Sequence, residues 1–103
     1  MALTVKTQVA GETAKLSLIG RFDFTVHREF RQSYEGVVSQ PGVTGVEIDL
    51  GGVDYIDSSA LGMLLLLKES VEHYHLQLAL TNCPGSVRRV FEVANFQKLF
   101  SLS

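Results

Sequence analysis

Hydrophobic and polar residues alternate along four short segments of the chain, which is the pattern typical of half-buried β-strands. These segments are residues 3–9, 14–19, 45–50 and 76–80. Only a short turn, Ala10-Gly11-Glu12, separates the first two segments. Because so short a connection usually joins neighbouring antiparallel strands, we predict an N-terminal β-hairpin.

Apolar residues recur every three or four positions in three other segments, which predicts helices. The predicted helices cover residues 26–38, 58–74 and about 84–94. Pro41-Gly42 follows the first helix and ends it. The third helix carries its apolar stripe on Val87, Val90, Phe91 and Ala94.

Two stretches are predicted to be connections rather than strands. In residues 20–25, Asp23 or Thr25 is expected to cap the helix that follows, because both side chains can accept a backbone N–H. In residues 51–56, Gly51-Gly52 interrupts the alternation of the third strand. Residues 96–102 are expected to form a turn and an edge strand.

The predicted order is β-β-α-β-α-β-α, with or without a final strand, which places the chain in the α/β class. Alternation of β and α after the hairpin predicts right-handed parallel crossovers, so we expect a small mixed sheet of four to five strands. Strands that are covered on both faces are almost continuously apolar, whereas these four alternate. We therefore expect about three helices on one face of the sheet, in a single domain of residues 1–103.

The composition narrows the classes of function. The formal net charge of −2 argues against broad electrostatic binding to nucleic acid or anionic lipid. The longest apolar run, residues 61–67, is too short to span a bilayer, and residues 1–13 contain no apolar segment of the signal-peptide kind. The single Cys83 fits a reducing compartment. We expect a cytoplasmic protein without membrane insertion.

The second predicted helix can be oriented from its charged residues, because Lys68, Glu69 and Glu72 belong in water. Steps of three and four residues back from Lys68 and Glu72 define an outward stripe, and the opposite stripe is the predicted core face. The outward stripe is Ser58, Leu61, Gly62 and Leu65, and the core face is Ala60, Met63, Leu64, Leu67, Val71 and Tyr74. An exposed apolar cluster often marks an interaction site. The spacing leaves a second interpretation equally open, in which neighbouring loops cover the leucines.

Asp57 stands at the predicted N-cap of this helix, and Ser58 and Ser59 fall in its first turn. On pattern alone, the simpler interpretation is that these residues only satisfy the free N–H groups of the helix start. The same amides and the positive end of the helix dipole also accommodate a phosphate. Phosphoserine would add about −1.5 to −2 charges beside Asp57, and beside Asp23 and Asp54 if the fold brings them near, and a docked partner would be rejected. These considerations do not choose between the two serines.

The run Asp57-Ser58-Ser59-Ala60-Leu61-Gly62, which follows the strand at 46–50, resembles the signature of the STAS family of bacterial anti-sigma factor antagonists. Gly20-Arg21-Phe22-Asp23 resembles a second family loop, and the element order matches over essentially the whole chain. The resemblance implies the STAS fold and a partner switch. The unphosphorylated antagonist binds an anti-sigma factor that is also an ATP-dependent serine kinase. The kinase phosphorylates a serine at the start of this helix, and a PP2C-type phosphatase removes the phosphate.

Residue by residue, the resemblance assigns phosphorylation to Ser58, with Ser59 as the fallback acceptor, and it places Asp23 near the phosphosite, facing the partner. The family usually has Gly where this chain has Ala60, which is a mild departure. Together with the helix stripe, these positions define the predicted docking surface. It consists of Asp23, Asp57, Ser58, Ser59, Leu61, Gly62 and Leu65.

Other classes of function differ in how well they fit the sequence. The alternative is a STAS accessory subunit of a lipid or anion transport system, without phosphorylation. A nucleotide-binding domain is disfavoured, because no Gly-rich phosphate loop is present. We expect no cofactor and no metal, since His27, His73 and His75 lack ligand spacing. We expect no enzyme, since Ser58, His27 and Asp23 come without a nucleophile elbow. We expect the free protein to be a monomer.

Overall fold

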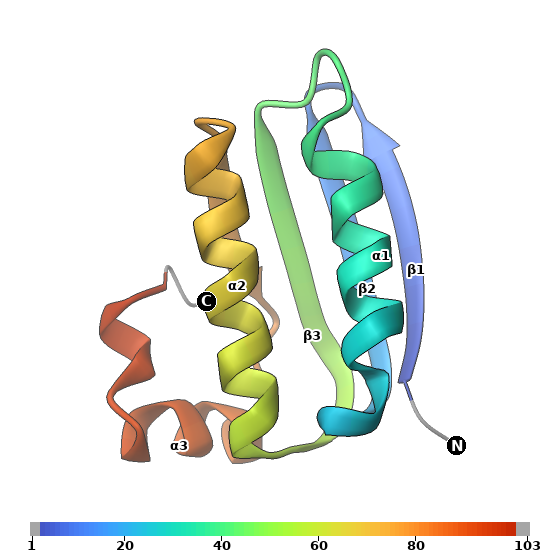
Figure 1. The fold of residues 1–103 in the computed structure, drawn as a ribbon. Coiled ribbons are helices and arrows are strands. Elements are labelled where there is room, and N and C mark those ends of the chain that lie inside the picture. The colour runs from blue at the N-terminus through green and yellow to red at the C-terminus, as the bar shows by residue number, and fades with distance from the viewer. Residues whose placement is uncertain (1–2, 101–103) are drawn as a thin grey trace.

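The computed structural model describes residues 3–100, which form four strands, three α-helices and two 3₁₀ helices (Figure 1). The strands are β1 (Leu3–Ala10), β2 (Thr13–Phe22), β3 (Gly45–Ile56) and β4 (Gln77–Thr81). The α-helices are α1 (His27–Val38), α2 (Ser58–His73) and α3 (Gly85–Val93), and the 3₁₀ helices are η1 (Phe24–Val26) and η2 (Phe96–Lys98). The order of strands and helices predicted from the sequence is confirmed.

The four strands form one mixed sheet in the order β1-β2-β3-β4. β1 and β2 are antiparallel, and Gly11 turns the chain between them with a φ of +63°, which a glycine adopts without steric cost. β2 pairs with β3 in parallel, as does β3 with β4, so α1 and α2 are the crossover helices. Figure 1 shows these two helices lying over the same face of the sheet. The predicted mixed α/β architecture is therefore confirmed.

The two faces of the sheet differ in chemistry. The face under the helices carries fully buried apolar side chains, namely Ala14, Leu16, Leu18, Ile48, Leu50 and Leu80. On the other face, Lys15 Nζ lies 3.6 Å from Asp49 Oδ2, and the Thr81 hydroxyl donates to Glu47 Oε2 at 2.7 Å. Coverage on one face only is the reason why the strands alternate in sequence.

Both predicted connections turn out to contain strand residues. β2 extends to Phe22 and β3 extends to Ile56, so residues 20–22 and 51–56 belong to the sheet. The register between β2 and β3 shifts twice along this part of the sheet. A bulge breaks the alternation of apolar and polar residues while the strands stay paired. For this reason the sequence of residues 20–22 and 51–56 is typical of loops, although these residues belong to strands.

Gly52 stands at the first of these shifts. Ser17 pairs with Asp49 and Ile19 pairs with Gly52, so β3 carries one residue more than β2 between these pairs. A Cβ at residue 52 would lie 2.9 Å from Ile19 Cγ1 and 2.9 Å from the Leu18 carbonyl oxygen. Only a glycine allows the two strands to approach this closely.

Two further expectations are corrected. Tyr74, assigned to the core face of the second helix, is 45% exposed, because the helix ends at His73. The expected edge strand within residues 96–102 is not a strand where the structure describes it. Residues 96–98 form η2, and the ring of Phe100 packs 6.3 Å from that of Phe91. Residues 101–102 lie outside the described part of the chain.

We expect Gly52→Ala to destabilise the fold by about 1–3 kcal/mol, because the added methyl group overpacks β3 against β2. Gly36→Ala in α1 is the matched control, since a Cβ there meets no heavy atom within 4 Å. Replacing this helical glycine is expected to stabilise the fold by about 0.5–1 kcal/mol. Urea denaturation measures both effects, and stabilisation by both substitutions would contradict the close approach at Gly52.

Candidate functional site

The carboxyl ends of the parallel strands β2 and β3 meet at the end of the sheet where α2 begins (Figure 1). Phe22 and Ile56, the last residues of the two strands, are paired, and the Asp57 N–H donates to the Phe22 carbonyl oxygen at 3.4 Å. Asp23 and Asp57 therefore follow neighbouring strand ends. Open α/β sheets bind ligands outside this edge. The structure thus brings both acidic residues of the predicted site to the edge where binding is expected.

Asp57 also positions the two serines, because it caps α2. Its Oδ1 accepts a hydrogen bond from the Ala60 N–H at 3.1 Å, which confirms the predicted N-cap. Asp57 alone separates β3 from α2, so no long loop precedes the helix. Ser58 and Ser59 are both exposed in the first turn. They stand at the positive end of the helix dipole, which favours a negative group.

Asp23 is held in a similar way at the start of η1. Its Oδ1 accepts hydrogen bonds from the Thr25 N–H, at 3.0 Å, and from the Thr25 hydroxyl. Its Oδ2 lies 3.5 Å from Arg21 Nε. The hydrogen bonds from Thr25, that of the hydroxyl above all, and the nearby guanidinium hold the pKa of Asp23 below its ordinary value. Asp23 is therefore a carboxylate at neutral pH, and Arg21 partly offsets its charge.

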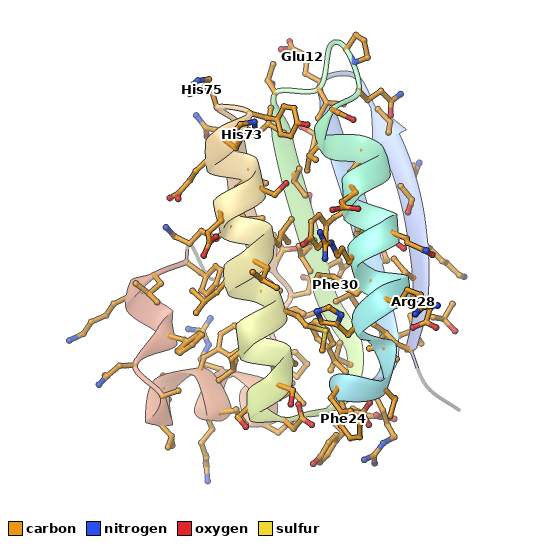
Figure 2. All side chains as sticks on the ribbon, viewed as in Figure 1. Glu12, Phe24, Arg28, Phe30, His73 and His75 are labelled. Carbon is orange, nitrogen blue, oxygen red and sulfur yellow. The ribbon has the colours of Figure 1, made fainter. Side chains whose placement is uncertain are left out.

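An exposed aromatic side chain, Phe24, follows Asp23. Phe24 is 68% exposed and lies at the end of the molecule where α2 begins (Figure 2). On the adjoining strands, the Arg21 guanidinium lies 4.1 Å from the centre of the Tyr55 ring, at cation–π distance. Aromatic and arginine side chains are enriched in protein interfaces. Phe24 was missed in the sequence, because one aromatic residue in an expected loop has no periodic partner.

The predicted exposure of Leu61 is wrong. Leu61 is only 3% exposed, although it lies on the side of α2 that faces α3 across a groove. Leu65, one turn further on, is half-buried and packs against the core, whereas Gly62 is exposed as predicted. The exposed stripe of α2 instead contains Ser59, Gly62 and Leu66.

A groove of about 390 Å³ lies between the start of α2 and α3. Its lining residues are Ser58 and Leu61 from α2, and Ser86, Arg89, Val90, Val93 and Ala94 from α3 and its end. Val93 is 83% exposed, so the groove is an open, largely apolar surface. Its α3 residues recur at intervals of three and four. This spacing is the signal by which the sequence could have indicated a second exposed stripe.

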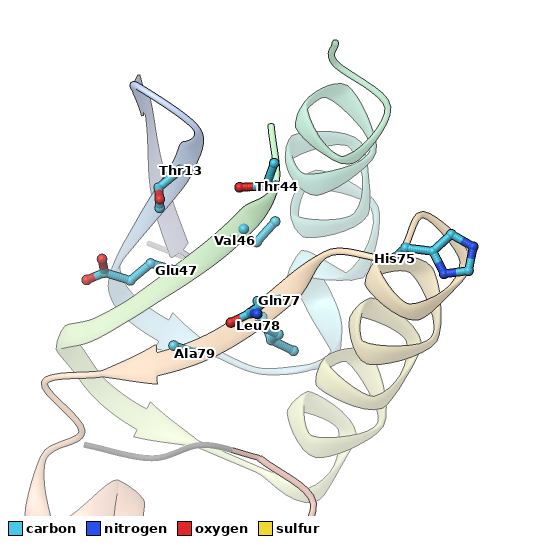
Figure 3. Close-up of a pocket in the computed structure, with 9 residues that line it drawn as sticks. Thr13, Thr44, Val46, Glu47, His75, Gln77, Leu78 and Ala79 are labelled. Carbon is cyan, nitrogen blue, oxygen red and sulfur yellow. The ribbon is translucent and has the colours of Figure 1, made fainter. Parts of the chain in front are cut away.

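A different hollow lies at the opposite end of the sheet (Figure 3). Thr13, Thr44, Glu47, His75 and Gln77 are among the residues that line it. It is found where β3 and β4 begin, which is the edge opposite to the one that ligands of open α/β sheets occupy. Within residues 3–100, no three His, Cys, Asp or Glu side chains are grouped for metal binding. No helix in the same part of the chain has the length and apolar character needed to cross a bilayer.

Over residues 5–102 the sequence matches the family described as "Mlab, STAS domain". The chain belongs to the STAS-domain family. It is 40% identical, over 103 residues and the whole of both chains, to a STAS-domain containing protein of Pseudomonas aeruginosa. It is 34% identical over 62 residues to a Bordetella bronchiseptica protein named "Putative anti-sigma factor antagonist BtrV". That match covers 60% of this chain and 53% of BtrV.

Solved structures of anti-sigma factor antagonists have the same fold. Unphosphorylated SpoIIAA superposes with a TM-score of 0.79 at 22% identity, over 99% of this chain and 88% of SpoIIAA. An antagonist from Mycobacterium paratuberculosis superposes with a TM-score of 0.85 at 20% identity, over 98% of this chain and 85% of its own. At such identities the likeness concerns the fold, and the STAS fold expected from the sequence is confirmed.

We expect Asp57→Ala to destabilise the fold by about 0.5–2 kcal/mol, because the Ala60 N–H loses its cap. Asp54→Ala is the control, since it removes the same charge from an exposed position of β3. It is expected to change stability by no more than about 0.5 kcal/mol. Thermal denaturation of both variants measures the difference, and equal losses would contradict the capping role of Asp57.

Proposed function

We propose that this protein is an anti-sigma factor antagonist that acts by partner switching, with Ser58 as its phosphorylated residue. The unphosphorylated form binds an anti-sigma factor that is also an ATP-dependent serine kinase. Phosphorylation of Ser58 releases the antagonist from this kinase. The position of Ser58 carries the proposal, because it is exposed directly after the Asp57 cap at the binding edge of the sheet. The name of BtrV, and the fold shared with unphosphorylated and phosphorylated SpoIIAA, support this role.

Exposure alone does not choose between the two serines, but their surroundings differ. Ser58 lines the apolar groove together with Leu61. Ser59 belongs to the stripe of α2 that contains Gly62 and Leu66. A phosphate on Ser58 therefore changes the charge of the groove directly. For this reason, and because the family motif matches Ser58, we assign the phosphate to Ser58 and keep Ser59 as the alternative acceptor.

The chain supplies only the acceptor hydroxyl in this phosphoryl transfer. The Ser58 oxygen forms a bond to the γ-phosphorus of ATP while the bond to the leaving ADP oxygen breaks, and the hydroxyl proton passes to a base of the kinase. The short junction at Asp57 holds the acceptor in one place, which lowers the entropic cost of orienting it. A PP2C-type phosphatase hydrolyses the phosphoester, so that serine and inorganic phosphate are restored.

The proposed docking surface keeps the residues predicted from the sequence but changes the roles of two. Leu61 contributes the floor of the groove rather than an exposed side chain, and Leu65 contributes only its accessible part. Exposed apolar contact comes instead from Phe24 and Val93. Large apolar side chains that a partner can bury completely contribute most to binding.

Phosphorylation changes the charge of this surface rather than its fold. Asp23 and Asp57 already lie at the end of the sheet where α2 begins, and Arg21 partly offsets the negative charge of Asp23. Phosphoserine adds about −1.5 to −2 charges. A partner that fits the apolar groove would then have to desolvate this charge beside carboxylates, which costs binding free energy. With unmodified Ser58 the partner meets no such cost.

We expect the chain to become phosphorylated on Ser58 when it is incubated with ATP and the serine kinase that co-purifies with it from its source organism. Ser58→Ala should abolish the modification, whereas Ser59→Ala should retain it. Intact-protein and peptide mass spectrometry locate the phosphate. A phosphate that survives Ser58→Ala but not Ser59→Ala would move the switch to Ser59. No phosphate on any of the three proteins would contradict the switch.

The alternative function, an accessory subunit of a lipid or anion transport system, is separated by the same purification. It predicts that transporter components co-purify with the chain, without a serine kinase. It also predicts that binding does not depend on the charge at residue 58.

A further inference from the structure

The two sides of the groove between α2 and α3 carry a serine and an arginine. Ser58 lines the groove from α2, Arg89 lines it from α3, and Leu61, Val90 and Val93 make up most of the apolar lining. Arg89 is exposed, and none of the ion pairs formed among residues 3–100 involves it. Its guanidinium is therefore not committed to a carboxylate in the described part of the chain.

The preceding residue, Arg88, has a different environment. It is half-buried and is not among the residues that line the groove. Its charge acts instead on the Cys83 thiol, whose pKa is raised mainly by burial. The two arginines are thus neighbours of equal charge on one helix, and only Arg89 shares the groove with Ser58.

We propose that Arg89 binds the phosphate of phosphorylated Ser58, so that phosphorylation joins α2 to α3 across the groove. The inference rests on the proposed function in one respect, namely that the phosphate is placed on Ser58. A guanidinium pairs with a phosphate through two parallel, charge-assisted hydrogen bonds. The apolar lining strengthens this attraction, because it screens the charges less than water does.

The two carboxylates at this end of the sheet also direct the phosphate toward Arg89. Asp57 repels it, and its Oδ1 is already occupied by the Ala60 N–H. Asp23 is also negative, and its Oδ2 lies near Arg21. The phosphate is therefore repelled from the carboxylates and attracted toward α3.

The Arg89–phosphate pair gives phosphorylation a second effect besides the added charge. A phosphate and a guanidinium that meet across the groove cover the apolar side chains that stay accessible there, those of Val90 and Val93. A partner that buries the same side chains then finds the groove both charged and occupied. Arg89 thereby couples the modification of one residue to the accessibility of the whole apolar surface.

The test uses the full chain with phosphoserine encoded at residue 58 by amber suppression, so that no kinase is needed. Melting temperatures are measured for the phosphorylated and unphosphorylated forms of the wild type, Arg89→Gln and Arg88→Gln. The double-mutant cycle removes the direct effect of each substitution. It also removes the repulsion between the phosphate and Asp57, which is the same in all the phosphorylated proteins. What remains is the coupling between the phosphate and the arginine.

We expect the change in Tm that the phosphate causes to be about 4–8 °C more positive in the wild type than in Arg89→Gln. For Arg88→Gln we expect no such difference. Arg89→Lys should keep part of the coupling, because a lysine retains the charge without the bidentate geometry. The same phosphate-induced change in the wild type and in Arg89→Gln would overturn the pairing, as would an equal coupling for Arg88. Since the phosphate is encoded, these outcomes are independent of whether a kinase modifies Ser58.

Discussion

The candidate site depends on one short junction, in which Asp57 alone joins β3 to α2. The backbone N–H of Asp57 donates to the Phe22 carbonyl oxygen, which ties the junction to the neighbouring strand. Its carboxylate accepts from the Ala60 N–H and so starts the helix. One residue therefore sets both the origin and the direction of α2. Because strand and helix are packed in the core, Ser58 lies on a rigid edge, which suits the phosphate acceptor that we propose it to be.

The rest of the structure brings the residues of the proposed docking surface to this end. Six of the sixteen residues of α2 are buried in the core, and they include most of its large apolar side chains. What stays accessible near its start is a small set of contrasting features: two serines, two carboxylates, the exposed Phe24 and an open apolar groove. An apolar surface next to fixed negative charge responds strongly to a further anion, because desolvating like charges together is costly. In the function that we propose, this contrast allows a single phosphate to act as a switch.

Features that depend on residues close in sequence were predicted correctly. The hairpin, the crossovers, the single covered face of the sheet and the Asp57 cap all follow from local alternation, helical spacing and capping chemistry. The glycine pair before Val53 misled the prediction of β3, because a bulge and a loop look alike when only the alternation of residues is considered. The extension of β2 to Phe22 was missed for the same reason.

The errors at the site have a different cause, which is contact between distant parts of the chain. Leu61 lies on a stripe that leads to charged residues, and nothing near it in sequence shows that it is buried on the side of α2 that faces α3. Arg89 was missed for the same kind of reason, since only the folded chain brings α3 to the end where Ser58 lies. Phe24 was missed because a single aromatic residue in an expected loop has no periodic partner. The family motif, together with capping chemistry, is what selects Ser58 as the proposed acceptor, whereas a description of its surroundings required the tertiary structure.

The central claim is that the charge at residue 58 controls partner binding, and a pair of isosteric variants tests it most directly. Ser58→Glu and Ser58→Gln differ in charge but hardly in size, so calorimetric titration of each with the kinase partner isolates the electrostatic effect. We predict that Ser58→Glu binds at least about tenfold more weakly than Ser58→Gln, which corresponds to about 1.4 kcal/mol. Equal affinities of the two variants would contradict the electrostatic switch.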